Sequence, residues 1–472
     1  MPSTPKTLSG SHDPYAALRH SNYRYYAIGN FMAITADRML ATAVGYELWK
    51  RTHSATALGL WGLVLAAAFL LMALPGGHLA DRYNRKFVIL LSEIFLSLCA
   101  LGLAWVSFHN AGLLPADWTV KCNHALEGIA GILEKHMSLL QGTKGPGYSF
   151  QDPSVPSIFF LLFCYGFCQS LSIPAKNALL PQLVPATHFS NAVMWGSQIF
   201  QIGSIIGPPI TGVIIAAWGF PVAYLASVVC FLSFFTLLLS LVKSKETQAT
   251  REPVTLQTLL AGVRFVRKTK IILATITLDL FAVLVGGATA LLPMFADDIL
   301  HVGSYGFGWL MAAPSIGALC MAVALTHLPP MKQAGRALLW SVAGFGIATI
   351  VFGLSQWFWL SMFMLFLTGA LDNISVVIRA TLVQVLTPNE MRGRVSAVNF
   401  MFIVASNELG GAESGFTAAL FGPVLSVVAG GIGTVLVVLG VAWLWPEVAA
   451  LGSLDSPKAR PKPEDENEPA VL

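Results

Sequence analysis

The hydrophobic pattern of this chain is a series of long apolar runs separated by short polar stretches. A helix needs roughly 20 mostly apolar residues to cross the hydrocarbon core of a bilayer. Runs of that kind recur along almost the whole sequence. The pattern therefore predicts twelve membrane-spanning helices, at about 24–48, 56–80, 87–108, 156–184, 188–217, 220–242, 271–299, 305–328, 336–355, 357–386, 393–420 and 423–446.

The composition agrees with a lipid environment. The chain has 472 residues, of which 55% are hydrophobic and 11% are charged, whereas a soluble domain carries about 25% charged residues. A soluble protein this apolar would expose patches that cause aggregation. We therefore expect an all-α, multi-pass membrane protein whose main partner is the lipid bilayer.

The positions of the cations predict the topology. Most of the 28 lysines and arginines fall in segments on the same side of the membrane as the N-terminus. The segments on the other side carry only Lys50, Arg51, Lys121, Lys135 and Lys144. This bias places both termini in the cytoplasm and requires an even number of spans. The start of the chain, MPSTPKTLSG, is too polar for a cleavable signal peptide, and a bacterial inner membrane is the expected location.

The spans divide into two bundles of six around a charged linker. The expected units are an N-terminal tail at 1–22, a bundle at 23–243, a cytoplasmic linker at 244–270, a second bundle at 271–446 and a disordered tail at 447–472. Residues 109–155 form an insertion on the outer side. Apolar residues recur in it at helical spacing, which allows either an amphipathic helix on the membrane surface or a tolerated loop without a role.

An internal repeat supports the two bundles. The fourth run reads GFCQSLSIPAKNALLPQLVP from Gly166, and the tenth reads GALDNISVVIRATLVQVLTP from Gly369. A constant offset of 203 aligns Ser172 with Ser375 and the cation Lys176 with Arg379. Repeated halves place a substrate site near the bilayer midplane between them.

A short cationic motif lies between the second and third spans. The segment GHLADRYNRK contains Gly77, Asp81, Arg82, Arg85 and Lys86. It resembles motif A of the major facilitator superfamily, G-x-L-A-D-R-x-G-R-[RK], with an asparagine in place of the second glycine. The resemblance implies the twelve-helix major facilitator fold, with Asp81 capping the eleventh helix and the motif acting as a conformational latch. The alternative is that these cations only set the topology.

A second motif lies in the fifth span, which reads GSIIGPPITG from Gly203. Gly203, Gly207, Pro208 and Gly212 are similar to the family's antiporter motif C, with Thr211 in place of a glycine. Together with the segments SNYRYYAIGN, PAKNALLPQLVP and IRATLVQVLTPNEMRGRVSA, it resembles the branch that contains enterobactin-exporter and macrolide-efflux-type proteins. Gly203 and Gly207 give a flat face for helix packing. Generic packing is the alternative to a role in export.

Ionisable residues inside the predicted spans are candidates for function, because burying a charge there costs about 2.5–3.5 kcal/mol. Asp37 is the leading proton carrier, with a structural ion pair as the alternative; Glu408 and Asp279 are further candidates. Arg38 points about 100° away from Asp37, so we do not expect these neighbours to pair. We expect Asp297 and Asp298, at the outer end of the seventh span, to be solvated.

Other polar residues suggest a cavity and contacts between the bundles. The candidates for the substrate cavity are Arg38, Gln169, Trp195, Gln198, Asn407 and Glu413. The candidates for charge pairs across the two bundles, with motif A or its neighbours, are Lys176, Arg379 and Asp372.

The sequence thus predicts a secondary active transporter that exports an amphipathic small molecule, drug- or siderophore-like, in exchange for protons. The alternatives are an importer or lysophospholipid flippase of the same fold, and a membrane sensor that does not transport. The chain lacks a G-x-S-x-G elbow, a P-loop and an H-E-x-x-H motif, so we do not expect an enzyme or an ATP-driven pump. We expect no cofactor, metal site or nucleic-acid partner, and a monomer.

Overall fold

The computed structural model describes residues 13–109, 152, 154–240, 256–329, 331–388 and 391–452, and every regular element in these ranges is helical. The long helices of the first set, called here the N-terminal set, are α1 Ser21–Thr52, α2 Ala55–Arg82, α3 Arg85–His109, α5 Ser154–Leu183, α6 Phe189–Trp218 and α7 Phe220–Leu239. The C-terminal set contains α9 Lys270–Val285, α11 Gly303–His327, α12 Ala334–Leu354, α13 Phe358–Leu386, α14 Arg392–Phe421 and α15 Pro423–Leu444.

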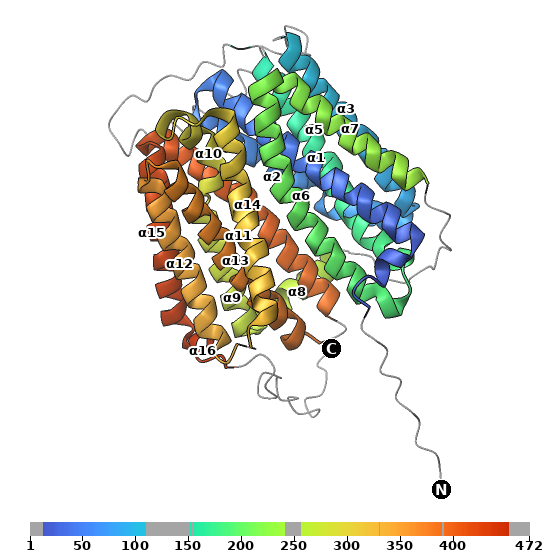
Figure 1. The fold of residues 1–472 in the computed structure, drawn as a ribbon. Coiled ribbons are helices and arrows are strands. Elements are labelled where there is room, and N and C mark those ends of the chain that lie inside the picture. Colours follow the sequence, from blue (N-terminus) through green and yellow to red (C-terminus); the bar gives the residue numbers. More distant parts are fainter. Residues whose placement is uncertain are drawn as a thin grey trace.

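Short elements complete the described chain. They are η1 Ala17–Arg19, η2 Ala186–His188, α8 Leu256–Lys268, η3 Ala288–Leu291, α10 Leu292–Met294, η4 Phe295–Ile299 and α16 Pro446–Ala449. The helices α8 and α16 lie at one end of the molecule, the lower end in Figure 1, which we call the linker end. The opposite end, with the turns at 53–54 and 300–302, is the far end. The predicted insertion at 109–155 falls almost entirely outside the described residues.

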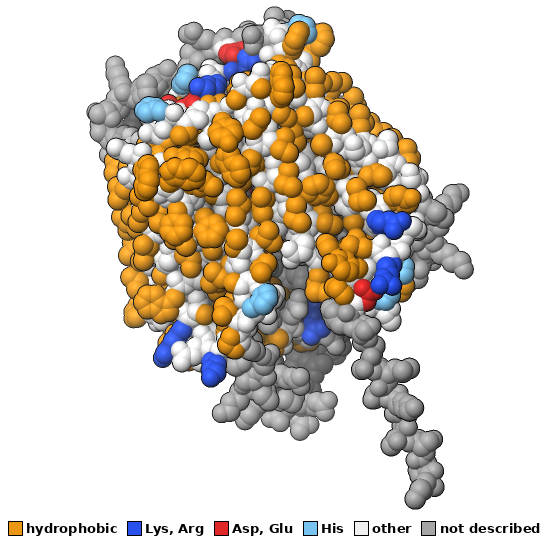
Figure 2. Space-filling model, in the orientation of Figure 1, with side chains coloured by type: hydrophobic (Ala, Val, Ile, Leu, Met, Phe, Trp, Pro, Cys, Tyr) orange, Lys and Arg blue, Asp and Glu red, His pale blue; other side chains and the backbone are white. Residues whose placement is uncertain are grey.

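The chain has the helices that a multi-pass membrane protein needs. Ten of the described helical segments are long and apolar enough to cross a bilayer. The two remaining long helices, α1 and α14, have 32 and 30 residues but are more polar. They carry Asp37 and Glu408, so the two spans that fail the apolar criterion are those that hold the leading candidates for proton coupling. Apolar side chains cover the middle of the surface, and charged ones gather at its two ends (Figure 2).

Each set packs mainly within itself. In the N-terminal set, α1 packs against α6 and α7, α3 against α5 and α7, and α2 against α5; in the C-terminal set, α12 and α11 pack against α13, and α9 against α14 and α15. Two pairs of long helices, α6 with α11 and α2 with α14, join the sets. In Figure 1 the sets diverge toward the linker end.

The helix boundaries repeat between the two sets. The offset of 203 residues that aligns α5 with α13 also carries α6 onto α14 and α7 onto α15, with bounds that agree within two residues. The same offset relates Gly219 to Gly422, which end α6 and α14 with φ of +83°. A side chain is strained at that φ, so glycine is the residue that fits. The repeat therefore extends over three consecutive spans rather than about twenty residues.

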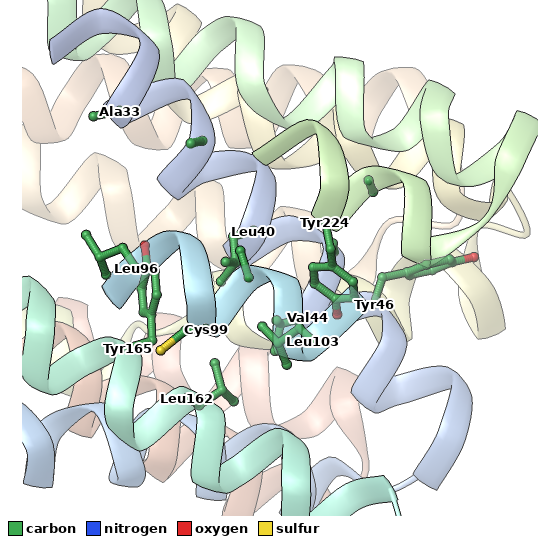
Figure 3. Packing of buried hydrophobic residues seen from close by; sticks show 14 of the residues in the cluster. Ala33, Leu40, Val44, Tyr46, Leu96, Cys99, Leu103, Leu162, Tyr165 and Tyr224 are labelled. Carbon is green, nitrogen blue, oxygen red and sulfur yellow. The ribbon is translucent and has the colours of Figure 1, made fainter. Parts of the chain in front are cut away.

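The larger core cluster of the described residues is centred on the N-terminal set and continues into the C-terminal set. Leu96 and Cys99 of α3 and Tyr165 of α5 pack together beside Leu40 of α1 (Figure 3). All four side chains are less than a tenth exposed. This packing fixes α1, α3 and α5 relative to one another, and these helices carry most of the polar site described below.

The seventh span differs from the continuous helix predicted at 271–299. The helix α9 ends at Val285, two glycines follow, and the chain then continues as η3, α10 and one π-helical turn, η4. At Gly287 an added Cβ would lie 2.7 Å from the carbonyl oxygen of Gly410 on α14. Because the backbones approach this closely, the chain can bend there only with residues that lack side chains.

Candidate functional site

The centre of the site is Asp37, about halfway along α1. Its Oδ1 accepts hydrogen bonds from the Tyr165 hydroxyl and from Gln169 Nε2, the latter at 2.5 Å, and both donors come from α5. Gln169 Nε2 also lies 3.1 Å from the Tyr165 hydroxyl. The Asp37 side chain is 25% exposed, so the carboxylate is held by two donors and still accessible. This combination suits a group that must both exchange a proton and keep its position.

Arg38 lies beside Asp37 and pairs with it, which corrects the expectation that these neighbours point apart. An Nη2–Oδ2 distance of 3.6 Å separates the two charges, because the arginine side chain is long enough to bend back. Its guanidinium carbon lies 5.3 Å from the centre of the Phe200 ring on α6. Its Nε is buried and has no hydrogen-bond partner among the described residues. Arg38 therefore keeps a free donor next to the central carboxylate.

Glu408 approaches this pair from α14 of the other set. The charges of both Arg38 and Asp37 act on its carboxyl group. The backbone around Glu408 is pressed against α2, because a Cβ on Gly62 would lie 2.5 Å from the Glu408 carbonyl oxygen. Asp37 and Arg38 pair within the N-terminal set, and Glu408 lies near enough for both charges to act on it; we call these three residues the central cluster. With both acids ionised the cluster carries a net charge of −1, and a single added proton neutralises it.

The motif C glycines allow close helix packing around Asp37 and Arg38. An added Cβ at Gly203 would lie 2.8 Å from Ile34 Cγ2, and one at Gly207 would lie 2.8 Å from Arg38 Cβ. Gly212 instead faces α11, where its Cβ would lie 3.3 Å from Gly308 Cα. The motif therefore packs α6 against α1 within its set and against α11 of the other set. Pro208, inside α6, contributes a carbonyl oxygen to this second contact.

Each set contains a buried ion pair on its repeated cation. Lys176 Nζ lies 2.8 Å from Oε1 of Glu93 on α3, and Arg379 pairs with Asp279 on α9. Glu93 is fully buried, and Arg379 also donates to the Ser375 hydroxyl at 3.2 Å. Both cations thus pair inside their own set. This corrects the expectation from sequence that they pair across the two sets. Their depth explains this, because each cation reaches a buried acid on a neighbouring helix of its own set.

At the far end a second polar group joins the sets. Asp297 of η4 accepts a hydrogen bond of 2.6 Å from the Tyr46 hydroxyl and lies 2.7 Å from Lys50 Nζ. The Tyr46 ring stacks on Phe307 of α11 at a centroid distance of 5.1 Å. The Asp297 side chain is 11% exposed, which corrects the expectation that it is solvated; Asp298 is exposed. The far end is therefore closed by contacts between the sets.

The remaining candidates are not part of the central cluster. Trp195 lies at the linker end, where its indole donates to the Pro14 carbonyl at 3.0 Å. Gln198 is exposed on α6. Glu413 contacts the Ser414 hydroxyl at 3.5 Å. Asn407 lines a separate cavity inside the C-terminal set together with Asp372.

Motif A is only partly described. The side chains of residues 76–82 lie outside the described residues, so the roles of Gly77, Asp81 and Arg82 stay predictions. Arg85 donates to the Ala178 carbonyl at 3.2 Å and Lys86 to the Leu239 carbonyl at 3.1 Å. Both contacts lie within the N-terminal set. Leu239 is the last residue of α7, where a cation interacts favourably with the helix dipole.

Several site residues were missed at the level of sequence. Glu93 and Glu47 are charged residues inside apolar runs, and the rule that selected Asp37 applies to them as well. Glu47 is buried and accepts from Tyr224 at 2.5 Å and from Arg51 Nε at 2.8 Å. Tyr165 and Tyr46 cannot be found by that rule, because they carry no charge and a tyrosine in a span most often only packs against other side chains.

The fold and site define a multi-pass helical membrane transporter, and comparison with known proteins identifies its family. The sequence model of the Major Facilitator Superfamily matches residues 26–410, and the chain belongs to that family. It is 28% identical over 426 residues to the enterobactin exporter EntS of Escherichia coli O1:K1 / APEC, covering 90% of this chain and 91% of that protein. The same figures hold for EntS of Shigella boydii serotype 18.

Solved structures show the same fold. A bacterial homologue of the iron transporter ferroportin, in an inward-facing state, superposes with a TM-score of 0.62 at 13% identity, covering 91% of this chain and 99% of that one. The nucleoside transporter NupG gives a TM-score of 0.64 at 12% identity and covers 90% and 99%. A bacterial homologue of the lysosomal transporter Spinster, inward-facing and unoccupied, gives 0.62 at 15% identity and covers 96% and 100%.

Proposed function

We propose that this protein is a proton-coupled exporter of an amphipathic organic molecule, drug- or siderophore-like, in a bacterial inner membrane. The observation that carries the proposal is the central cluster, in which Arg38 lies beside Asp37 and within the field of Glu408 from the other set. The likeness to an enterobactin exporter over most of both chains supports export. The cation bias of the sequence supports a cytoplasmic linker end.

The cluster suggests how a proton and a substrate would compete. With both acids ionised, Arg38 attracts Asp37 and Glu408 together and favours the contact between the sets. A proton on either acid weakens that attraction, since the electrostatic term depends on both charges. A substrate with an acceptor group would take the free Nε donor of Arg38 and draw it from the acids. Each event changes the same contact, which is the condition for coupling.

The closed far end fits the step at which an exporter loads substrate. The contacts of Lys50, Tyr46 and Phe307 join the sets there, and the sets diverge toward the linker end (Figure 1). Alternating access then requires the far-end contacts to break while the linker end closes. A substrate would enter from the cytoplasm and leave on the outer side.

The test is uptake into inside-out vesicles with an acidic interior, using a panel of lipophilic cations, macrolides and siderophores. The wild-type protein should accumulate at least one compound against its gradient. Asp37→Asn should lose accumulation but keep substrate exchange, and Glu408→Gln should reduce accumulation. Asp298→Asn, which removes an exposed acid far from the cluster, is the control. Accumulation only under the reversed gradient would indicate an importer, and gradient-driven accumulation by Asp37→Asn would exclude Asp37 as the proton carrier.

A further inference from the structure

A small cavity with several polar side chains in a mainly apolar wall lies inside the C-terminal set, away from the central cluster. Its volume is about 200 Å³, and α9, α11, α12, α13, α14 and the break after α9 all contribute to its wall. Pockets for organic ligands usually measure about 300–1,000 Å³. The cavity is therefore too small for the proposed substrate, and a small ion with a few waters would fit it.

The C-terminal end of α9 and the break after it lie at this cavity. The carbonyl oxygens at this end pack against glycines of the neighbouring helices: a Cβ added to Gly410 of α14 would lie 2.7 Å from the Val283 oxygen, and Gly430 of α15 faces the Val285 oxygen. The last carbonyls of a helix lack partners within it and carry the negative end of the helix dipole. Val283 and both break glycines line the cavity. This end of α9 favours a positive charge.

The side chains around the cavity offer mainly oxygen acceptors. Three threonine hydroxyls line it, those of Thr289, Thr349 and Thr368, together with the Asn407 amide. Thr349 donates its hydrogen to the Phe345 carbonyl at 2.9 Å, and Thr368 donates to the Leu365 carbonyl at 2.6 Å. Because each hydroxyl has one hydrogen and two lone pairs, these two keep only acceptor capacity for a ligand.

One carboxylate on the wall lacks a compensating charge. Asp372 lines the cavity and has no hydrogen bond or ion pair among the described residues. The charged groups that act on it are Arg379 and Asp279, and these two already pair with each other. The three groups together carry a charge of about −1. The cavity wall includes no described lysine, arginine or histidine, and an isolated charge inside the membrane is unfavourable.

We propose that this cavity binds one Na⁺ ion, held by Asp372 and the surrounding hydroxyl and amide oxygens and favoured by the negative end of the α9 dipole. One uncompensated carboxylate matches one positive charge, whereas divalent cations prefer several carboxylates among 6–8 oxygen ligands. A proton would need Asp372 alone and would leave the oxygen wall without a role. A helix that ends beside a cavity inside the membrane places the negative end of its dipole there, which favours a cation.

The test is direct binding of ²²Na⁺ to the purified full-length protein in lipid nanodiscs, with choline replacing Na⁺ at constant ionic strength. We expect saturable binding of one ion per chain, abolished in Asp372→Asn. Thr368→Val keeps the charge and the shape but removes an oxygen, and should weaken binding roughly tenfold, equivalent to about 1.4 kcal/mol. Asp298→Asn, an acid of the same span outside the cavity, should bind as the wild type does.

The binding measurement does not depend on substrate, on a pH gradient or on Asp37. The proposed Na⁺ site can therefore be disproved without affecting the proposed export, and the reverse. Thermal unfolding without Na⁺ checks that Asp372→Asn folds; if it does not, Thr368→Val and Thr349→Val carry the test. The absence of saturable Na⁺ binding by the wild type would overturn the proposal, as would unchanged binding by Asp372→Asn. Proton uptake at Asp372 without Na⁺ binding would also overturn it.

Discussion

Lys50 and Asp297 face each other across the far end of the molecule, with 2.7 Å between the ammonium nitrogen and a carboxylate oxygen. One belongs to α1 and the other to η4 of the opposite set. The Tyr46 hydroxyl, one turn before Lys50, donates to the other oxygen of the same carboxylate at 2.6 Å. Two groups of α1 thus contact the carboxylate, and both contacts must break before the far end can open.

Breaking this contact should shift the protein toward a conformation open at the far end. An exposed ion pair contributes about 0.2–1 kcal/mol and a hydrogen bond to a charged group about 1.5–3 kcal/mol. Asp297→Asn removes the charge, and Tyr46→Phe the hydrogen bond. A loss of about 2 kcal/mol would change the population ratio roughly thirtyfold. Spin labels at Thr52 and Tyr305 should report a longer distance in both variants. Asp298→Asn, the adjacent acid, should leave the distance unchanged.

Gly207 should not accept a side chain. A Cβ there would lie 2.8 Å from Arg38 Cβ and 3.0 Å from the Thr35 carbonyl oxygen, and relieving such an overlap typically costs about 1–3 kcal/mol. Gly207→Ala should therefore lower the thermal unfolding temperature in detergent and displace Arg38 from Asp37, so transport should fall as well. Gly440→Ala is the matched control, because nothing lies within 4 Å of its Cβ position. Equal melting of both variants would contradict the close packing of α6 on α1.

Removing one partner of the Lys176–Glu93 ion pair should destabilise the protein more than neutralising both. Glu93 is fully buried, and removing one partner of a buried ion pair costs about 3–5 kcal/mol because the other charge is left unpaired. Lys176→Met should therefore be strongly destabilised in thermal unfolding. Adding Glu93→Gln should recover most of the loss. Lys332→Met, at an exposed lysine, should have little effect. If the double variant is no more stable than Lys176→Met, the pair does not account for the cost.

Sequence reasoning located the long helices, the repeat and Asp37 as an ionisable residue inside a span, and it failed where partners come from distant helices. The apolar runs fix the helices because each must satisfy its backbone within itself. Asp37 could be found as a charge inside a span, but its donor Tyr165 lies 128 positions away and looks like packing. The break at Gly286 depends on glycines of α14 and α15 that approach it only in the folded chain. Span boundaries and charged residues inside spans can be read from the local sequence. Side-chain pairs and helix breaks depend on contacts that form only in the tertiary structure.

Asp152, just before α5, should give the protein an acid-sensitive contribution to stability. Burial raises the pKa of this carboxyl, but hydrogen bonds from Ser154 and Arg51 outweigh burial and leave the pKa below its usual value. Because the folded-state pKa is lowered, the ionised carboxylate stabilises the folded protein at a pH above the unfolded-state pKa of about 3.9. This stabilisation is lost as the pH falls through the folded-state pKa. Asp152→Asn should therefore melt below the wild type at pH 7, and the difference should shrink as the pH falls below about 3.9. Asp13→Asn, in an exposed pair with Arg19, should change little. A difference that stays constant over this range would show that Asp152 acts by packing and not by charge.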